Sequence, residues 1–421
     1  MSAFKRLLKI LGPGFITGAS DDDPSGIATY SQTGAQWGYS QLWTALFFFP
    51  FMTIIQEMCG RIGLVTGKGL AQTIKAHYPA PILYGAVLIL FVANTVNIGA
   101  DLGAMAETGR LLFGWPILPC LIGITLLSIG LQVFIPYQSY SKFLKVLTLS
   151  LFAYIITALV VHQDWKHILH DTLIPQLSLN PAYLMNLVGL LGTTISPYLF
   201  FWQTSEEVEQ AVEEGRLSDM GQGHPRFAPA DIQDMQWDTA GGMFFSQLIM
   251  FFIIVTTAST LGAKGLTQIN TAAEAAQALR PIAGEGAFAL FSIGILGTGL
   301  LAVPVLAGSA AYALSETFAW PNGLYKKPKS ALGFYGIITA ATLAGFCIHF
   351  THLPPFKLLY YTAILNGLCA PPLMALILLI ANNPQIMRQQ QNRTLSNTLG
   401  WLITILMALA GITLILNLIK H

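Results

Sequence analysis

The sequence predicts an all-α integral membrane protein with eleven transmembrane helices. Of its 421 residues, 54% are hydrophobic and only 10% are charged, and the mean hydropathy is +0.60. Soluble proteins carry roughly 25% charged residues, so most of this protein's surface must face something other than water. Apolar segments of about 20 residues, the length that crosses a bilayer as a helix, recur along the whole chain.

These apolar segments are separated by short connections, except for a polar stretch from Thr204 to Asp238. No segment has the composition of a separate soluble domain, so residues 1–421 are expected to form one transmembrane domain. The expected spans are 12–34, 41–64, 80–107, 113–135, 143–162, 182–203, 239–262, 287–317, 331–350, 357–381 and 396–418.

The positions of lysine and arginine predict the orientation, because these residues favour the cytosolic side of a membrane. The amino-terminal segment and alternate connections hold Lys5, Arg6, Lys9, Lys68, Lys75, Lys142, Lys145, Arg216, Arg226, Lys326, Lys327, Lys329, Arg388 and Arg393. The other connections hold Arg110, Lys166, Lys264, Arg280 and Lys420. We therefore expect a multi-pass protein of the cell (inner) membrane with a cytosolic amino terminus and an external carboxyl terminus. Met1 to Ile10 has no small-residue cleavage site, which favours a cytosolic lead-in over a signal peptide.

Two of the expected spans are interrupted near their middle. The first contains the run GASDDDPSG at 18–26, and the sixth contains GTTISPY at 192–198. Proline removes a backbone donor, and glycine and short polar residues permit unwinding. The breaks lie five spans apart, which predicts a 5+5 inverted repeat (about 12–162 and 182–381) with a substrate site at the bilayer midplane. The span at 396–418 would then lie outside the repeat.

Asp21, Asp22 and Asp23 are the strongest local signal for such a site. Even one aspartate at mid-membrane costs about 2.5–3.5 kcal/mol, so three in a row are expected to face water or a cation. Unwinding at Pro24 and Gly26 would let them reach one cavity and would free carbonyls for coordination. We expect Asp23 to be the principal metal ligand. The alternative is a wet loop between two half-helices, in which one aspartate caps a half-helix.

The sixth span is expected to face these carboxylates with Thr193 and Ser196, on either side of its break. Together with Asp22 and Ser20, these residues would complete the ion's shell directly or through water. A Thr-Thr-x-Ser-Pro run in an isolated membrane helix more often bonds its hydroxyls back to the helix. Its symmetric placement opposite the aspartates favours the ligand role here.

Further polar residues in the spans are candidates for an ion or proton pathway. Asp101 and Asn94 in the third span form one such pair, with a buried, hydrogen-bonded aspartate as the alternative. Thr362 and Asn366 in the tenth span form another, with interhelical hydrogen bonding as the alternative. Glu57, four residues before Arg61, is expected to form a local ion pair.

The residue types near the breaks predict the kind of metal. All histidines fall in loops or near span ends, and no methionine or cysteine lies beside either break. Oxygen ligands favour hard ions such as magnesium, calcium or manganese over zinc or copper. The acidic segment from Glu206 to Glu214 is interpreted as a solvated helix end, with a cation-attracting vestibule as the alternative.

At these same residues the sequence resembles the NRAMP family of divalent metal transporters. The similarity lies in residues 12–15 (GPGF), 23–26 (DPSG), 34–39 (GAQWGY), 64–68 (LVTGK) and 192–197 (GTTISP). It extends over essentially the whole membrane region. The resemblance implies the LeuT-like fold, with a metal ion held between the broken first and sixth helices.

The sequence departs from this family at several functional positions. Gly26 stands where the family motif Asp-Pro-Gly-Asn has its ligand asparagine, and Ser196-Pro197-Tyr198 replaces Met-Pro-His. On the third helix, Asp101 matches a family aspartate, but the two associated glutamate positions are Ala104 and Asn94. This pattern resembles a divergent branch of NRAMP-related magnesium transporters, and it places Tyr198 and Asp21 among the candidate pathway residues.

We therefore expect import of a hard divalent cation, magnesium first and manganese second, by alternating access with weak or absent proton coupling. The alternatives are a proton-coupled manganese or iron symporter that uses Asp21, Asp22 or Asp101, a sodium-coupled carrier of organic solutes, and a transporter-like sensor. An enzyme is not expected, because no nucleophile, base and orienting group occur together. The expected partners are the transported cation and the lipid bilayer, with no other cofactor, no nucleic acid and no obligate protein partner.

Overall fold

The computed structural model describes residues 12–137, 149–351 and 353–420. The expected lead-in at Met1 to Ile10 and two of the basic residues, Lys142 and Lys145, lie outside these ranges. In order along the chain, the α-helices are α2 (Pro13–Asp21), α3 (Pro24–Trp37), α4 (Trp43–Thr66), α5 (Leu70–His77), α6 (Ala80–Phe113), α7 (Ile117–Phe134), α9 (Phe152–Val160), α10 (Trp165–Leu173), α11 (Pro181–Thr194), α12 (Pro197–Glu213), α13 (Pro229–Thr260), α14 (Ala272–Ala276), α15 (Arg280–Ala283), α16 (Ala287–Phe318), α17 (Leu332–Ile348), α18 (Pro355–Asn382), α19 (Pro384–Met387) and α20 (Thr394–Lys420). Short 3-10 turns join some of them, including η1 (Leu149–Leu151) before α9.

The all-α membrane fold is confirmed, but the exact number of spans stays a prediction. By length and composition, eight helical stretches in the described ranges can cross a membrane, and one of them joins α11 and α12. Two apolar helical stretches are shorter, Leu149–Val160 and Leu332–Ile348. The half-helices α2 and α3 occupy the expected first span.

Both helix breaks lie where the sequence predicts them. Helix α2 ends at Asp21 and α3 begins at Pro24, while α11 ends at Thr194 and α12 begins at Pro197. Each second half-helix therefore starts on a proline. At that position the missing N–H is one of the donors that a helix leaves unsatisfied in any case, and the fixed φ suits the first turn.

The polar stretch from Thr204 to Asp238 is mostly helical, which corrects the expected boundaries of two spans. Helix α12 continues to Glu213, and α13 begins at Pro229, ten residues before the expected start of its span. A helix can continue beyond the hydrocarbon core as long as its polar residues reach water, so hydropathy alone underestimates its length.

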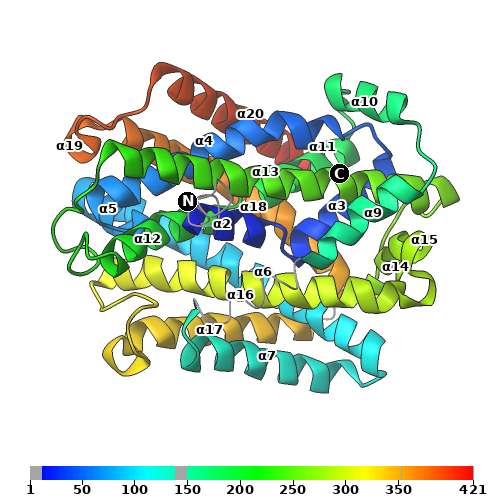
Figure 1. The fold of residues 1–421 in the computed structure, drawn as a ribbon, viewed down its shortest axis with the longest axis horizontal. Helices are drawn as coiled ribbons and strands as arrows, with labels where there is room; N and C mark the ends of the chain where they lie inside the picture. The colour runs from blue at the N-terminus through cyan, green and yellow to red at the C-terminus, as the bar shows by residue number, and fades with distance from the viewer. Residues whose placement is uncertain (1–11, 138–148, 352, 421) are drawn as a thin grey trace, which may run out of the picture.

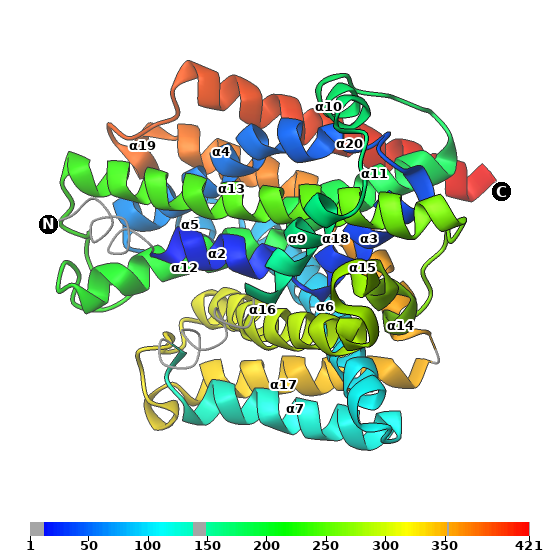
Figure 2. The same cartoon turned by 45° about the vertical axis from the view of Figure 1, so that its right-hand side comes forward.

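The long helices form two layers (Figures 1 and 2). Helices α2, α3, α4, α12 and α13 pack against one another on one side, and α6, α7, α16 and α17 pack together on the other. Figure 2 shows α7 and α17 along one edge of the molecule and α4, α13 and α20 along the opposite edge, with α2 and α12 between them. Helix α18 joins the two layers, because it contacts α3 in one and α6 in the other. It also packs against α11 and α20.

Helix α2 lies on α13 at very short range. A Cβ atom added to Gly18 would lie 2.2 Å from the carbonyl oxygen of Gly242, and one added to Gly14 would lie 2.6 Å from Thr239. Small residues allow such backbone approach between membrane helices. The carboxylate of Asp238 also accepts hydrogen bonds from the backbone N–H groups of Gly12 and Gly14, at 2.8 and 2.7 Å. These contacts hold the start of the first broken helix on α13.

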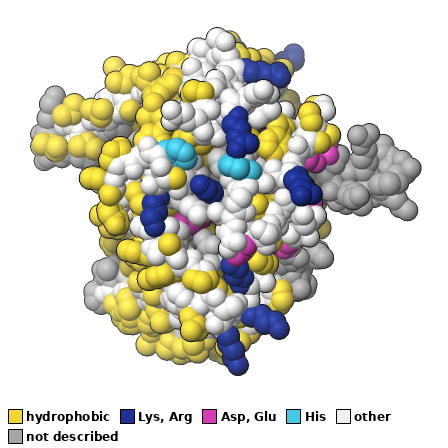
Figure 3. All heavy atoms as spheres, turned by 90° about the vertical axis from the view of Figure 1, so that its left-hand side faces the viewer, with side chains coloured by type: hydrophobic (Ala, Val, Ile, Leu, Met, Phe, Trp, Pro, Cys, Tyr) yellow, Lys and Arg dark blue, Asp and Glu magenta, His cyan; other side chains and the backbone are white. Residues whose placement is uncertain are grey.

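Basic side chains gather at one end of the molecule (Figure 3). This is the end on the left of Figure 1, where α5, α12 and α19 lie, and α20 finishes at the opposite end. The connections that reach it carry Lys68, Lys75, Arg216, Arg226, Lys326, Lys327, Lys329, Arg388 and Arg393. These are the lysines and arginines, among the described residues, from which the sequence predicts the cytosolic side. The structure places them at the same end of the molecule.

Candidate functional site

The two helix breaks lie side by side in the interior. Asp21, the last residue of α2, and Asp22 and Asp23, between α2 and α3, are at most 1% exposed. Gly26, in the first turn of α3, lies against the other break, because a Cβ atom added there would be 3.2 Å from the hydroxyl oxygen of Thr193. The hydroxyl of Tyr198 in α12 donates a hydrogen bond to the carbonyl oxygen of Ser20 at 3.0 Å.

Asp23 is fully engaged by the protein. Its Oδ1 accepts hydrogen bonds from the hydroxyl of Ser25 at 2.6 Å and from the backbone N–H of Gly26 at 2.7 Å. Its Oδ2 accepts a hydrogen bond from the side-chain amide of Asn97 in α6 at 3.0 Å. Asp23 is therefore the N-cap of α3, a position that aspartate favours. The residue that the sequence favours as principal ligand is the one that caps a half-helix.

Asp21 and Asp22 are only partly engaged. The hydroxyl of Ser246 in α13 lies 2.6 Å from Oδ2 of Asp21 and 3.4 Å from Oδ1 of Asp22. Oδ1 of Asp21 and Oδ2 of Asp22 are buried without a hydrogen-bond partner. Among the described residues, no lysine or arginine forms an ion pair with either carboxylate. Burying carboxylate oxygens without a partner is costly, so this pair requires a positive charge or protons.

Helix α6 adds a third unpaired carboxylate. Asp101 lies one turn beyond Asn97 and is buried, and neither of its oxygens has a hydrogen-bond partner. Asn94 has a structural role, because its side-chain amide donates to the carbonyl of Leu306 and the hydroxyl of Ser309 in α16 at 2.8 and 2.7 Å. Of the two pathway candidates in the third span, Asn94 is hydrogen-bonded to α16 and Asp101 has no hydrogen-bond partner.

Most of the other predicted hydroxyl groups bond back to their own helices. Ser20 donates to the carbonyl of Ile16, Ser196 donates to the carbonyls of Gly192 and Thr193, and Thr362 donates to that of Leu359. The hydroxyl proton of each residue is therefore used in a hydrogen bond to the backbone, although the oxygen keeps lone pairs that could bind an ion. Beyond the aspartates, three predicted residues keep a polar atom without a partner: the hydroxyl of Thr193, the side-chain nitrogen of Asn366 in α18 and the side-chain oxygen of Asn94. The Tyr30 hydroxyl lies near that of Thr193 without a well-formed hydrogen bond.

The described residues contain no group of three or more His, Cys, Asp or Glu side chains arranged to hold a metal ion. An ion at the breaks would therefore need other oxygens in addition to the carboxylates. Backbone carbonyls freed by the breaks, the Thr193 hydroxyl and water can supply them, and all are hard ligands.

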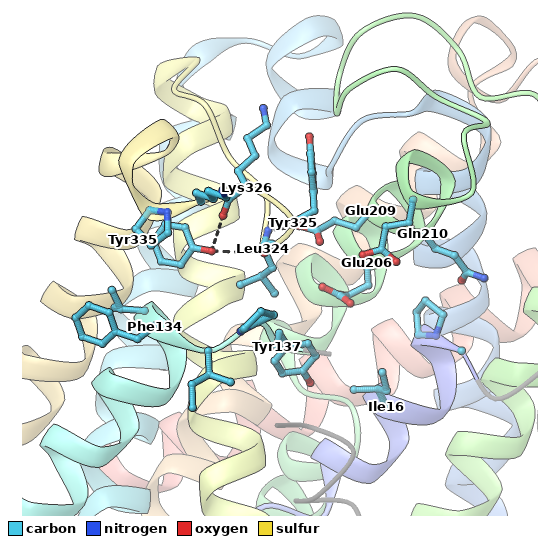
Figure 4. A pocket seen from close by; sticks show the side chains of 18 of the residues that line it. Ile16, Phe134, Tyr137, Glu206, Glu209, Gln210, Leu324, Tyr325, Lys326 and Tyr335 are labelled. Carbon is cyan, nitrogen blue, oxygen red and sulfur yellow. Dashed lines mark hydrogen bonds between the residues drawn. The ribbon is translucent and has the colours of Figure 1, made fainter. Parts of the chain in front are cut away.

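A cavity of about 680 Å³ approaches the breaks from the basic end of the molecule (Figure 4). Gly12, Pro13 and Ile16 bring one face of α2 to it. Figure 4 shows Glu206, Glu209 and Gln210 of α12 on one side of this cavity and Lys326 and Tyr335 on the other. The sequence interpretation of the Glu206–Glu214 segment as a plain solvated helix end is therefore incomplete, since most of its glutamates line a cavity.

A second cavity, of about 190 Å³, lies on the opposite side of the breaks. Ala28, Gln32 and Gln36 bring one face of α3 to it. The remaining lining includes the amide side chains of Gln268 and Asn270, together with Lys357, a residue not predicted from the sequence. The carboxylates thus lie between two cavities, one bordered by α2 and the other by α3.

Ser246 was not among the residues predicted from the sequence. It lies in the middle of an otherwise apolar stretch of α13, where a single serine most often bonds to its own helix. The sequence offered one indication of its role: Ser246 and Gln247 are two consecutive polar residues within this apolar span. Recognising Ser246 required the packing of α13 on α2. By contrast, the predicted ion pair of Glu57 and Arg61 is confirmed at 2.8 Å.

Comparison with known proteins gives one family and several solved structures. The family model described as natural resistance-associated macrophage protein-like (Nramp) matches residues 14–417. The structure of a manganese transporter from Eremococcus coleocola is similar with a TM-score of 0.76 and 18% identity, over 98% of this chain and 87% of that one. Mhp1, a nucleobase-cation-symport-1 family transporter in a closed conformation, gives a TM-score of 0.61 and 13% identity, over 97% and 90%. A Na⁺-coupled sialic acid symporter gives 0.54 and 11%, over 96% and 90%.

Proposed function

Because the chain belongs to the Nramp family, we propose that it carries a divalent metal cation across the cell membrane by alternating access. The chain is a multi-pass membrane protein of a transporter family, not an enzyme. The observation that carries the proposal is the pair of buried carboxylates at the first helix break, Asp21 and Asp22, each with an oxygen that no protein group satisfies.

The charge balance supports a cation as the transported species. Intramembrane carboxylates are expensive and mark ion or proton pathways. Here Asp21, Asp22 and Asp23 adjoin each other, and Asp101 interacts electrostatically with Asp23. A divalent cation would offset two of these negative charges at once. An organic solute on the same fold would leave the unpaired oxygens unexplained.

The donor types support a hard cation, with magnesium first and manganese second. The breaks offer carboxylate, carbonyl and hydroxyl oxygens, and Ser196 stands where the resembling motif has a methionine. A Cβ atom on Gly26 would lie 3.2 Å from both the Asp21 carbonyl oxygen and the Thr193 hydroxyl oxygen, so glycine keeps these two oxygens uncrowded. Magnesium prefers oxygen ligands and usually keeps several waters, which fits a site built from oxygens alone. The relative from Eremococcus coleocola is named as a manganese transporter, which keeps manganese as the second candidate.

The two cavities support alternating access. The cavity bordered by α2 would become the cytosolic path, since it lies at the basic end, and the cavity bordered by α3 would become the external path. The same argument puts the amino terminus in the cytosol and the carboxyl terminus outside. In each half-cycle one of the half-helices would move away from the other layer and open its cavity to the carboxylates.

The second candidate is a proton-coupled symporter of manganese or iron. It is favoured by one observation, the two unpaired oxygens of Asp101 in α6, which could hold a proton. We assign weak or no proton coupling, because no histidine adjoins the breaks and Asn94 is committed to hydrogen bonds with α16.

Uptake into proteoliposomes distinguishes these candidates. Magnesium, manganese and calcium would be offered separately, with the internal pH recorded by an enclosed dye. We expect magnesium and manganese entry without internal acidification, and loss of entry in the Asp21→Asn/Asp22→Asn double variant. Asp164→Asn, which changes an exposed carboxylate at the cap of α10, is the matched control and should transport as the unmodified protein does. Manganese entry tied to acidification would favour the symporter instead, and absence of any metal entry would refute the proposal.

A further inference from the structure

We propose that Lys357, at the start of α18, weakens the capture of external divalent cations by repelling them in the cavity that α3 borders. This inference rests on the proposed function, in which that cavity becomes the external path. It makes Lys357 a determinant of the apparent affinity for the cation, through its charge alone and without a bond to the ion.

Lys357 is the single charged side chain in the described wall of this cavity. The other polar side chains that line it are the amides and phenols of Gln32, Gln36, Gln268, Asn270, Tyr360 and Tyr361. No carboxylate belongs to the described lining. A cation that enters the cavity therefore meets one positive charge and no fixed negative charge in its wall.

The charge of Lys357 is not compensated locally. The residue is exposed, and no aspartate or glutamate among the described residues forms an ion pair with it. It lies in the first turn of α18, which contains no acidic residue. A helix N-terminus carries a partial positive charge, so the helix dipole adds to the field of the lysine. Helix stability therefore does not account for a lysine at this position.

The wall around Lys357 is held by hydrogen bonds. On the α3 side, the amide of Gln32 donates to the carbonyl oxygen of Thr267 at 3.0 Å, and its oxygen accepts from the N–H of Ile269 at 2.9 Å. On the α18 side, the hydroxyl of Tyr360 donates to Oδ1 of Asn186 in α11 at 3.1 Å. The cavity holds about 190 Å³, so a cation inside it stays within roughly one Debye length of Lys357 at physiological salt.

The cavity at the basic end has the opposite charge balance in its wall. Its charged lining residues are Glu206, Glu209, Glu213, Glu214, Lys326 and Lys327, so carboxyl groups outnumber lysines there. Charge in the walls of a cleft changes the local concentration of ions. Divalent cations are therefore favoured at the cavity bordered by α2 and disfavoured at the cavity bordered by α3.

The expected size of the repulsion follows from Coulomb's law. In water, one positive charge about 10 Å away depletes a dication roughly fourfold. Screening reduces this factor to about threefold at 10 mM ionic strength and to about 1.5-fold at 0.15 M. The energy is half as large for a monovalent cation, so the effect falls mainly on divalent ions.

Manganese uptake into intact cells that express the full-length chain, with magnesium as a competitor, tests the role of Lys357. In such cells every copy presents the same face to the medium. At about 10 mM ionic strength, Lys357→Gln should lower the external KM about threefold and Lys357→Glu about sevenfold, with the maximal rate per copy unchanged. Both differences should shrink as the ionic strength is raised to about 0.15 M, because salt screens the charge.

Two matched variants separate the charge from other effects of substitution. Lys357→Arg keeps the positive charge and should keep the KM of the unmodified protein. Lys264→Gln removes another exposed lysine, in the connection after α13, that is not part of the described lining of this cavity, and it should also leave the KM unchanged.

Three results would overturn the role of Lys357 while leaving the proposed cation transport intact. They are an unchanged or raised KM in Lys357→Gln at low ionic strength, an equal change in Lys264→Gln, and a change in KM that does not depend on salt. Absence of divalent cation uptake by the unmodified protein would instead overturn the proposed function, and the inference with it.

Discussion

Gly26 shows at the residue scale how a missing side chain can define a site. Its backbone lies between the carbonyl of Asp21 and the hydroxyl of Thr193, and a Cβ atom would be closer to both than ordinary packing allows. In the resembling family motif this position carries an asparagine. An asparagine at this position would crowd both oxygens, and glycine avoids that contact.

Gly26→Asn is expected to reduce magnesium uptake roughly fivefold or more, because the new side chain would crowd the Thr193 hydroxyl and the Asp21 carbonyl oxygen. Overpacking at a tight site typically costs about 1–3 kcal/mol, and a loss of this size in binding would correspond to a roughly 5- to 150-fold effect. Initial rates of magnesium and manganese uptake in proteoliposomes provide the measurement. Gly189→Ala, at a glycine of α11 whose nearest atom would be an ordinary 3.5 Å away, is the control. Undiminished magnesium uptake in Gly26→Asn would contradict a role of the oxygens next to Gly26 in transport.

The sequence predicted the residues of the first break better than it predicted their roles. Three consecutive aspartates in an apolar segment are visible without any structure, because their cost in a membrane is so high. Which aspartate caps α3 depends on the residue at which the helix restarts. A shift of that start by one residue would make a different aspartate the cap. Ser246 was invisible because its importance comes from a contact with a segment more than 200 residues away.

At the scale of elements, the contact between α2 and α13 determines the geometry of the site. Gly14 and Gly18 of α2 lie against Thr239 and Gly242 of α13 with no room for a methyl group. Asp238 adds hydrogen bonds to the first N–H groups of α2, where a carboxylate is also favoured by the helix dipole. We infer that α2 cannot leave α13 without breaking these bonds.

Adjacent glycines of α13 provide a matched test of this contact. A Cβ atom on Gly242 would lie 2.3 Å from the carbonyl oxygen of Gly14, whereas one on Gly241 would meet nothing within 4 Å. Gly242→Ala should therefore destabilise the protein by about 1–3 kcal/mol and weaken cation binding, while Gly241→Ala should change neither. Thermal unfolding in detergent, with and without magnesium, measures both effects. Equal behaviour of the two variants would contradict the close packing of α2 on α13.

The loops at the basic end form a second contact between elements. Asp219, between α12 and α13, forms an ion pair with Lys326, between α16 and α17, at 2.9 Å. Burial raises the pKa of Asp219, but hydrogen bonds from Tyr325 and Lys326 and the charge of Lys326 outweigh it. The pKa of this carboxyl group therefore lies below its usual range.

A lowered pKa in the folded state means that Asp219 stabilises the protein above its unfolded-state pKa of about 3.9 and that this contribution is lost as the pH falls through the folded-state pKa. Asp219→Asn should lower the melting temperature at pH 7 by about 1–2 °C, the effect of one exposed ion pair. The difference from the unmodified protein should shrink as the pH falls below about 4. Melting curves between pH 3 and pH 8 would check this, with Asp234→Asn as the control for an exposed carboxylate. A difference that grows on acidification would contradict the assigned ionisation.

At the scale of the whole molecule, the two layers fit a transporter in which one group of helices moves against the other. The carboxylates lie between the layer of α2, α4, α12 and α13 and the layer of α6 and α16, because Asp23 belongs to the first and Asn97 to the second. Cavities approach this junction from opposite ends. A small displacement between the layers would therefore open one path and close the other.

The membrane character, the all-α fold and both helix breaks were predictable, because hydropathy and proline record them directly in the sequence. Their arrangement in two layers was not predictable from composition, since it depends on pairs such as α2 with α13 and α6 with α16. The short helices α5, α10, α14 and α15 were also not anticipated. They lie between the spans, where neither bilayer length nor hydropathy constrains the chain.

The most direct test of the central claim is to locate the ion itself by anomalous diffraction from crystals grown with manganese. A peak at the junction of the two breaks, at a coordination distance of about 2–2.6 Å from carboxylate oxygens of Asp21 and Asp22, is the result expected. A manganese peak confined to other parts of the molecule, or the absence of bound metal at saturating concentration, would contradict the claim that the buried carboxylates at the helix breaks form the transport site.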